Sequence, residues 1–195
     1  MTARAWTTAL LAAAVAAQLA APAWMIARRE AALRRGVVLR FRTAPVDPYD
    51  AFRGRYVALS FDGRSAPCPD AVRRRQTVYV CAEADTNGFA RLTRAALRPD
   101  AAGVWFRARA SHGPGPNGAG DKTLPLDLPF DRFYMDERAA PRAEELYRRA
   151  NRRGGPQDAW LQVRVHRGLA VPEDLYVSGR PIREMVLRWD GETKP

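Results

Sequence analysis

Acidic and basic side chains in two separate blocks are the residues of this chain whose types could do chemistry. The first block contains Asp47, Asp50 and Arg53, and the second contains Arg132 and Glu137. Carboxylates next to guanidinium groups could bind a ligand or exchange protons with a substrate if the fold brings both blocks to one cleft. We take these five residues as the candidate ligand-binding set, although turn formation and ion pairing with abundant arginines explain the acidic groups more simply.

The residue patterns that common catalytic and metal sites need are missing from the sequence. Neither of the two histidines, His112 and His166, has a second ligand at metal-binding spacing. There is no Gly-x-Ser-x-Gly segment for a serine nucleophile, Cys68 has no histidine nearby, and no glycine pattern matches a P-loop or a dinucleotide site. We predict no catalytic residue, no metal and no cofactor, which favours a non-enzymatic protein over an enzyme.

The chain has two cysteines, Cys68 and Cys81. An even count in an exported protein is compatible with one disulfide bond between them. The alternative is two unpaired thiols, with Cys81 at the end of a strand.

The charge of the chain is strongly basic. A net charge of +11 arises from 32 Lys and Arg against 21 Asp and Glu, and arginines account for nearly all of the positive side chains. No aromatic RNA-binding pattern, zinc-finger spacing or helix-turn-helix glycine accompanies this charge. We therefore do not expect nucleic acid as a partner, and a basic surface could instead contact anionic lipid headgroups.

Residues 6–26 contain no charged side chain and are mostly alanine and leucine. A helix of about 20 apolar residues crosses the hydrocarbon core of a bilayer, and Trp6 and Trp24 stand near the two ends of this segment, where indole rings prefer the headgroup level. We predict an uncleaved transmembrane anchor within residues 1–35. The alternatives are a signal peptide, cleaved at the small residues Ala21 and Ala23, and a buried helix of a soluble protein.

Residues 36–195 have mainly the alternating pattern of strands. Alternation is clearest at 37–42, 56–61, 104–108 and 160–166, and shorter segments at 78–81, 175–177 and 185–189 are also predicted as strands. One helix is predicted from Pro141 onward by apolar residues at i, i+3, i+4 and i+7 spacing, with Gly154 as its end. The fold class is mainly β (α+β): an N-terminal transmembrane helix followed by a compact antiparallel β domain with one packed helix.

The stretch from Thr43 to Phe61 joins a turn rich in Pro and Asp to an alternating strand. Gly54 permits a backbone geometry barred to other residues just before that strand begins. The strand then presents alternate side chains to one face, which predicts a buried side that includes Leu59 and Phe61, with Tyr56 at its start.

This stretch resembles the signature of the bacterial GDYXXLXY family, small membrane-anchored proteins with no established biochemical activity. Gly54, Tyr56 and Leu59 match the pattern of the signature, whereas Arg55 replaces its Asp and Phe61 replaces its final Tyr. Residues 128–137 and 175–182 resemble two further blocks of the family in the same order. Because Arg55 cannot do acid–base or metal chemistry, we interpret the signature as the start of a central hairpin in this chain.

The resemblance implies an extracytoplasmic domain in the bacterial inner membrane. The positive-inside rule alone favours the opposite orientation, because four arginines follow the apolar segment and one precedes it. The cleavage-like site at its end favours export, and we predict a periplasmic domain.

We therefore predict a non-enzymatic interaction module held at the membrane by a single-pass anchor, with a multipass membrane protein as its partner. The alternative is a ligand-binding or hydrolytic domain whose site lies between the turn at 45–54 and the block at 131–137.

Overall fold

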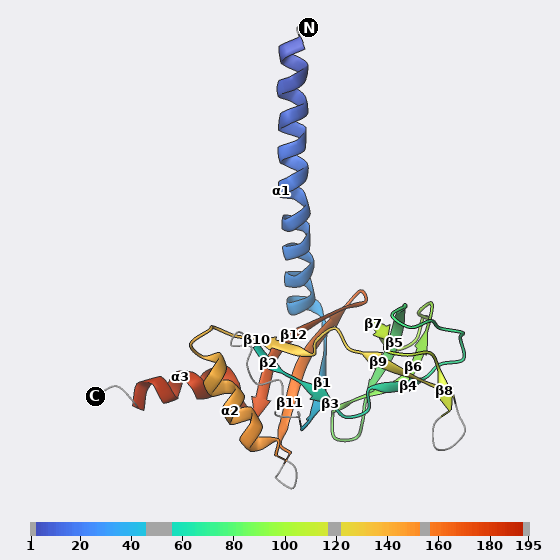
Figure 1. The fold of residues 1–195 in the computed structure, drawn as a ribbon, viewed down its shortest axis with the longest axis vertical. Helices are drawn as coiled ribbons and strands as arrows, with labels where there is room; N and C mark the ends of the chain where they lie inside the picture. The colour runs from blue at the N-terminus through green and yellow to red at the C-terminus, as the bar shows by residue number, and fades with distance from the viewer. Residues whose placement is uncertain (1–2, 46–55, 117–121, 153–156, 193–195) are drawn as a thin grey trace.

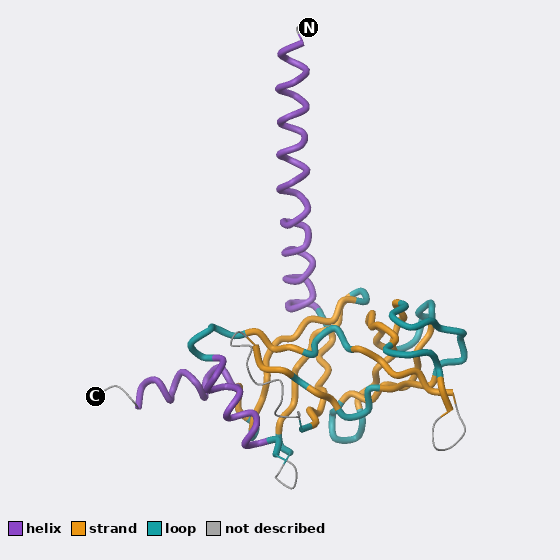
Figure 2. Tube along the Cα trace, viewed as in Figure 1, coloured by secondary structure: helices purple, strands orange, loops and turns teal. Residues whose placement is uncertain are grey.

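A long N-terminal helix leads into two antiparallel sheets, a two-stranded ribbon and two shorter helices in a computed structural model (Figure 1). The structure describes residues 3–45, 56–116, 122–152 and 157–192. The N-terminal helix stands away from the sheets, and two further helices lie together at one side of the domain (Figure 2). The predicted class, mainly β with an N-terminal apolar helix, is confirmed.

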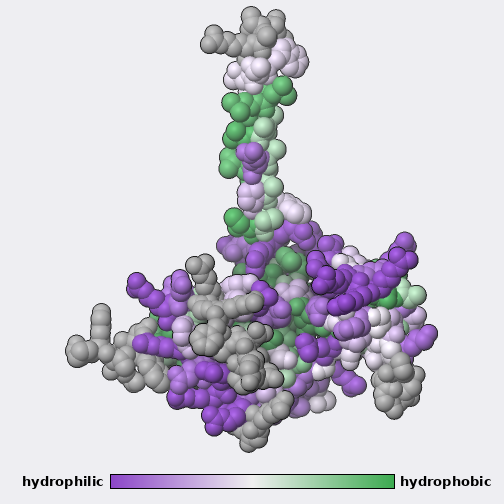
Figure 3. Space-filling view, in the orientation of Figure 1, coloured by the Kyte–Doolittle hydropathy of each residue, from purple (hydrophilic) through white to green (hydrophobic). Residues whose placement is uncertain are grey.

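Helix α1 runs from Ala3 to Arg35 and has Pro22 within it. The side chains from Trp6 to Ile26 are exposed, and their surface is mostly apolar, in contrast to the hydrophilic surface of the domain (Figure 3). By length and composition, this helix can cross a membrane. It ends against the domain, where Ala32 is buried and the Gly36 amide donates a hydrogen bond to its carbonyl oxygen at 2.8 Å.

The first sheet has the strand order β13-β12-β11-β1-β3. Its strands are β1 (Val37–Ala44), β3 (Ser60–Phe61), β11 (Ala159–His166), β12 (Leu169–Val177) and β13 (Arg180–Pro181). Strand β1 pairs along most of its length with β11, from Val37 opposite Val165 to Arg42 opposite Trp160. In β11, buried and half-buried side chains alternate without exception, as the sequence pattern predicts.

The second sheet has the order β4-β9-β7-β5-β6, and β8 pairs with β9 beside this path. Its strands are β4 (Ser65–Pro67), β5 (Thr77–Ala84), β6 (Ala90–Ala96), β7 (Val104–Ala110), β8 (Gly115–Pro116) and β9 (Lys122–Asp127). Two short strands, β2 (Tyr56–Ala58) and β10 (Arg132–Tyr134), pair with each other outside both sheets.

Helix α2 runs from Ala140 to Ala150 and α3 from Ile182 to Glu192. The prediction of a strand at 185–189 is wrong, because this segment lies within α3. Ile182, Met185 and Val186 have i, i+3 and i+4 spacing and pack in or against the core, which is a helical pattern. The predicted end of the other helix, Gly154, lies outside the described residues.

Four phenylalanines join the two sheets. The Phe130 ring centroid lies 4.8 Å from that of Phe41, 5.4 Å from Phe61 and 5.8 Å from Phe106. All four side chains are buried. Because Phe41 and Phe61 belong to the first sheet and Phe106 to the second, this aromatic cluster fixes the two sheets against each other.

Candidate functional site

The strand of the signature pairs with the second block of candidate residues. In this β2–β10 ribbon, Tyr56 lies opposite Tyr134, Val57 opposite Phe133 and Ala58 opposite Arg132. The Leu59 amide continues the pairing by donating to the Asp131 carbonyl oxygen at 2.8 Å. Two blocks that are distant in sequence therefore become neighbours through backbone hydrogen bonds.

On the outer side of the ribbon, the Arg132 guanidinium packs against the ring pair of Tyr56 and Tyr134. The rings of Tyr56 and Tyr134 lie 5.6 Å apart, and the Arg132 guanidinium carbon lies 5.0 Å from the Tyr56 ring centroid. A hydrogen bond with Tyr134, and then the charges of Tyr56 and Asp131, raise the pKa of Arg132. Arg132 and Tyr134 are exposed, so this group can meet a carboxylate or an aromatic ring of a ligand.

The five candidate residues are only partly described by the structure. Asp47, Asp50 and Arg53 lie outside the described residues, as do Gly54 and Arg55 of the signature.

The other two candidates lie in different elements. Arg132 is in the ribbon, whereas Glu137 is exposed in the turn that leads into α2. That turn is held by the neighbouring Asp136, whose side chain accepts from the Arg138 amide and whose carbonyl oxygen accepts from the Ala140 amide, both at 2.9 Å.

The remaining residues of the signature are structural. Leu59 and Phe61 are buried in the core and Tyr56 is half-buried. The single strand predicted at 56–61 is divided into β2 and β3, which pair with different partners, β10 and β1. The replacement of the family's final Tyr by Phe61 matches its position among the core phenylalanines, where a hydroxyl would need a buried partner.

A buried polar cluster lies between the end of β1 and the end of α2. Asn151 donates through Nδ2 to the Thr43 and Tyr147 hydroxyls, at 3.1 Å each, and Thr43 donates to the Ala159 carbonyl oxygen at 2.9 Å. The Tyr147 hydroxyl donates to the Ala44 carbonyl oxygen at 3.4 Å. Burial raises the pKa of Tyr147 above its ordinary 10.0, so the phenol stays neutral and a donor even in mildly alkaline solution.

Sequence reasoning missed this cluster. A signal was present, because Thr43 continues the inward-facing series of Leu39 and Phe41, and Tyr147 and Asn151 are one helical turn apart. Asn151 Oδ1 is buried and has no hydrogen-bond partner within the described part of the chain. The cluster can lock β1, β11 and α2 together, and among its side chains there is no base to activate the Thr43 or Tyr147 hydroxyl.

A groove of about 510 Å³ adjoins the ribbon at the side of α3. Its walls include the exposed side chains of Tyr134 and Leu187, and the Arg183 guanidinium carbon lies 5.0 Å from the Phe133 ring centroid. The other lining residues are Met135, Asp136, Arg138, Ala139 and Val186. The mixture of apolar walls and both charges suits a peptide-like ligand.

The structure does not contain the disulfide considered between Cys68 and Cys81, because both residues are free buried thiols. Cys68 belongs to the core, and its sulfur lies 3.8 Å from the Asp70 carbonyl oxygen. The Cys81 sulfur instead lies on the other side of β5, against Gly103. The sheet therefore separates the two thiols.

The described residues contain no group of three or more His, Cys, Asp or Glu side chains that could hold a metal ion. In the region of the ribbon, the candidate binding features are the Arg132 guanidinium and the groove beside it.

An exposed apolar helix that leads into a two-sheet β domain, with a ribbon joining two sequence blocks, defines the class of this protein. The family model described as GDYXXLXY protein matches residues 18–175, so the chain belongs to the GDYXXLXY family. The match includes the second half of the apolar segment and ends before α3. No curated protein and no solved structure matches the chain.

Proposed function

We propose that α1 anchors this chain in the bacterial inner membrane, and that the chain is a non-enzymatic interaction module for a multipass protein of the same bilayer. The observation that carries the proposal is Gln18, whose side-chain amide lies near the middle of the uncharged and exposed segment 6–26 of α1. In hydrocarbon, a side-chain amide lacks water and favours a hydrogen bond with another helix.

The composition of α1 supports the same conclusion. Alanine is the commonest residue from Trp6 to Ile26. Helices associate in a bilayer by close packing rather than by the hydrophobic effect, and small side chains allow the backbones to approach. A helix that is weakly hydrophobic and rich in alanine therefore gains more from a protein neighbour than from lipid alone.

The attachment of α1 to the domain would let such a neighbour position the sheets as well. A Cβ at Gly36 would meet the Arg164 Cβ at 3.0 Å, which shows how closely the helix end approaches β11. The Arg164 guanidinium in turn donates to Glu173 of β12 at 2.7 Å. We propose that the domain faces the periplasm, as the family resemblance implies. A C-terminal alkaline phosphatase fusion will be active in that orientation and inactive in the opposite one.

The test of the partner is co-purification of the full chain in mild detergent from the cells that produce it. We expect one membrane protein in reproducible stoichiometry, reduced severalfold by Gln18→Leu and unchanged by the neighbouring Leu19→Val as a control. The parent and both variants must stay in the membrane fraction after extraction with carbonate, which shows that the substitutions leave the anchor inserted. Absence of a reproducible partner, or an equal effect of both substitutions, would contradict the proposal.

A second candidate function is ligand binding or hydrolysis between the 45–54 turn and the 131–137 block. The pairing of β2 with β10 favours it, because β2 follows that turn directly and Arg132 is exposed beside Tyr56. Alanine substitution of Asp47, Arg53, Arg132 or Glu137 should then abolish complementation of a deletion strain. If all four variants complement like the parent, this function is excluded.

A further inference from the structure

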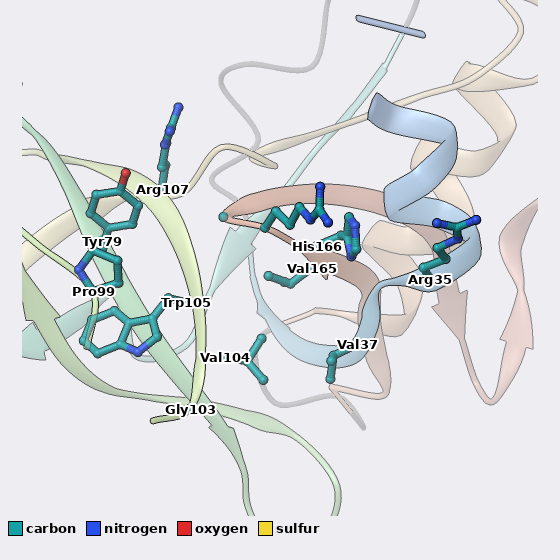
Figure 4. A pocket seen from close by; sticks show the side chains of 12 residues that line it. Arg35, Val37, Tyr79, Pro99, Gly103, Val104, Trp105, Arg107, Val165 and His166 are labelled. Carbon is teal, nitrogen blue, oxygen red and sulfur yellow. The ribbon is translucent and has the colours of Figure 1, made fainter. Parts of the chain in front are cut away.

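A pocket of about 500 Å³ lies where α1 joins the domain (Figure 4). One wall consists of Arg35 at the end of α1, Val37 of β1 and the turn between β11 and β12. The other wall comes from the second sheet, with Tyr79 of β5 and residues of β7. The residues from β7 are Val104, Trp105 and Arg107, those from the turn are Arg167 and Gly168, and the others are Pro99, Gly103, Val165 and His166. We call this the root pocket.

The two walls of the root pocket are fixed to each other. The Arg107 amide donates to the Gly168 carbonyl oxygen at 3.0 Å, and Phe106 forms a β-bridge with Gly168. Gly168 has a φ of 78°, and a Cβ there would lie 3.7 Å from the Tyr79 ring. The turn therefore docks on β7 through backbone contacts, so the pocket is a formed feature of the fold.

The root pocket is cationic. Arg35, Arg107 and Arg167 contribute three exposed guanidinium groups, and the lining contains no carboxylate among the described residues. None of the three forms an ion pair within the described chain, whereas Arg34, Arg94 and Arg164 each pair with a carboxylate. Three guanidinium groups around one pocket, without counter-ions, favour an anionic ligand.

The position of the root pocket decides between lipid and protein as the source of that anion. Arg35 follows Ile26, the last residue of the apolar run, by nine residues, a rise of about 14 Å along a helix. The headgroup layer is only about 5–7 Å thick on each side of the hydrocarbon core. With Ile26 at the edge of the hydrocarbon core, Arg28 and Arg29 lie at the level of the lipid phosphates, and Arg35 at the pocket lies beyond them. A protein segment that leaves the bilayer reaches this height easily.

We propose that the root pocket binds carboxylate side chains of an acidic juxtamembrane segment of the membrane partner. This inference rests on the proposed function, because it needs α1 and the partner in one bilayer. Arg107 of β7 and Arg167 of the turn between β11 and β12 belong to different walls of the pocket, and each would donate two hydrogen bonds to a carboxylate. Tyr79, with the Arg107 guanidinium carbon 5.7 Å from its ring centroid, orients that guanidinium.

The test uses the full chain in nanodiscs of phosphatidylcholine, with a fluorescein-labelled peptide of six glutamates as the probe. Fluorescence anisotropy should show binding that weakens about tenfold in the double variant Arg107→Gln, Arg167→Asn, because charge-assisted hydrogen bonds are lost. Asparagine suits position 167, whose φ is 48°. The matched control is Arg73→Gln with Arg74→Gln, which removes the same charge from an exposed loop. Unchanged urea midpoints will show that both variants fold.

Two results would overturn the inference. Equal weakening in the control would show that net charge alone attracts the peptide. Binding of phosphatidylglycerol nanodiscs or inorganic phosphate that depends on Arg107 and Arg167, without peptide binding, would assign the pocket to phosphate groups. The outcome is separate from the anchoring test: if co-purification depends on Gln18 while the peptide fails to bind, only the root pocket assignment is lost.

Discussion

Tyr56 and Tyr134 face each other across the β2–β10 ribbon, with ring centroids 5.6 Å apart. One residue belongs to the family signature and the other to the second block, so the ribbon explains why both blocks occur in one fold. Their neighbours Val57 and Phe133 turn inward and are buried. The signature is therefore first a strand-pairing element, and any binding by this region would use its outward side.

Phe133→Ala should destabilise the domain, because it removes a buried ring at the centre of the ribbon. Its side chain is 2% exposed, whereas that of Tyr134 is 63% exposed. We expect a loss of about 3–5 kcal/mol in the free energy of unfolding for Phe133→Ala, and of less than about 1 kcal/mol for Tyr134→Ala. Urea denaturation measures both. Similar losses at the two positions would mean that the ribbon is not packed as described.

The sequence predicted the strands whose two faces differ in polarity and failed where the chain changes partners. Strand β11 has one buried face and one half-buried face. Apolar and polar residues therefore alternate along it, and the sequence alone predicts the strand. The division of 56–61 into β2 and β3 is not predicted, because both strands keep the same alternation while pairing with different strands. Pairing partners are set by tertiary contacts that local periodicity does not record.

Helix α3 was missed for a different reason. A short segment such as 185–189 has an apolar composition that suits a strand, and only its spacing from Ile182 shows the helical face. The Thr43, Tyr147 and Asn151 cluster also needed the fold, since two of its members lie more than a hundred positions from Thr43. Of the candidate site, the structure shows that β10 with Arg132 pairs with the signature strand β2, and a binding role for this region stays a prediction.

Thr43→Val should cost about 1–3 kcal/mol although it preserves the shape of the side chain. The change leaves the Ala159 carbonyl oxygen without its donor and takes one acceptor from Asn151, and buried polar groups without partners are costly. Thr93→Val is the control, because its hydroxyl bonds Glu83 in an exposed setting. Thermal unfolding followed by circular dichroism distinguishes them. A Thr43→Val variant that is as stable as the parent would contradict the hydrogen bonds of the buried cluster.

Gly36→Ala should disrupt the junction between α1 and the domain. The added Cβ would lie 2.3 Å from the Ala32 carbonyl oxygen and 3.1 Å from the Val165 amide nitrogen, both backbone atoms that cannot move alone. We expect the free energy of unfolding to fall by about 1–3 kcal/mol. Gly115→Ala provides the comparison, since a Cβ there meets nothing within 4 Å. Equal stability of the two variants would show that the helix end is free to shift.

Both cysteines should remain reduced and shielded in the native protein. Cys68 and Cys81 are buried, and burial raises the pKa of Cys68, which lowers the fraction of reactive thiolate. Titration with a thiol reagent under non-reducing conditions should detect almost no reaction in the folded chain and two thiols after unfolding in urea. If no free thiol is detected after unfolding, Cys68 and Cys81 form a disulfide bond in the native protein, which would contradict this prediction.

Neighbouring carboxylates of β12 should give opposite pH dependence of stability. Burial alone would raise the pKa of Glu173, but hydrogen bonds from Arg164 and Gln162 outweigh it and lower the pKa below the ordinary 4.5. A lowered pKa in the folded state means that ionised Glu173 stabilises the fold. This contribution is complete above pH 4.5 and is lost as the pH falls through the lower folded value. Burial also raises the pKa of Asp174 above the ordinary 3.8, and there it prevails over the Leu175 amide and Arg183.

The two pKa shifts can be separated by substitution. Glu173→Gln should lose stability relative to the parent at neutral pH, and the difference should shrink as the solution is acidified. Asp174→Asn should do the reverse. The parent loses stability as the pH rises through the raised folded pKa of Asp174, whereas asparagine does not titrate. The stability of the variant relative to the parent should therefore increase from acid to neutral pH. Urea unfolding from about pH 3 to 7 measures both. Parallel pH profiles for the two variants would contradict the opposite directions of the pKa shifts of Glu173 and Asp174.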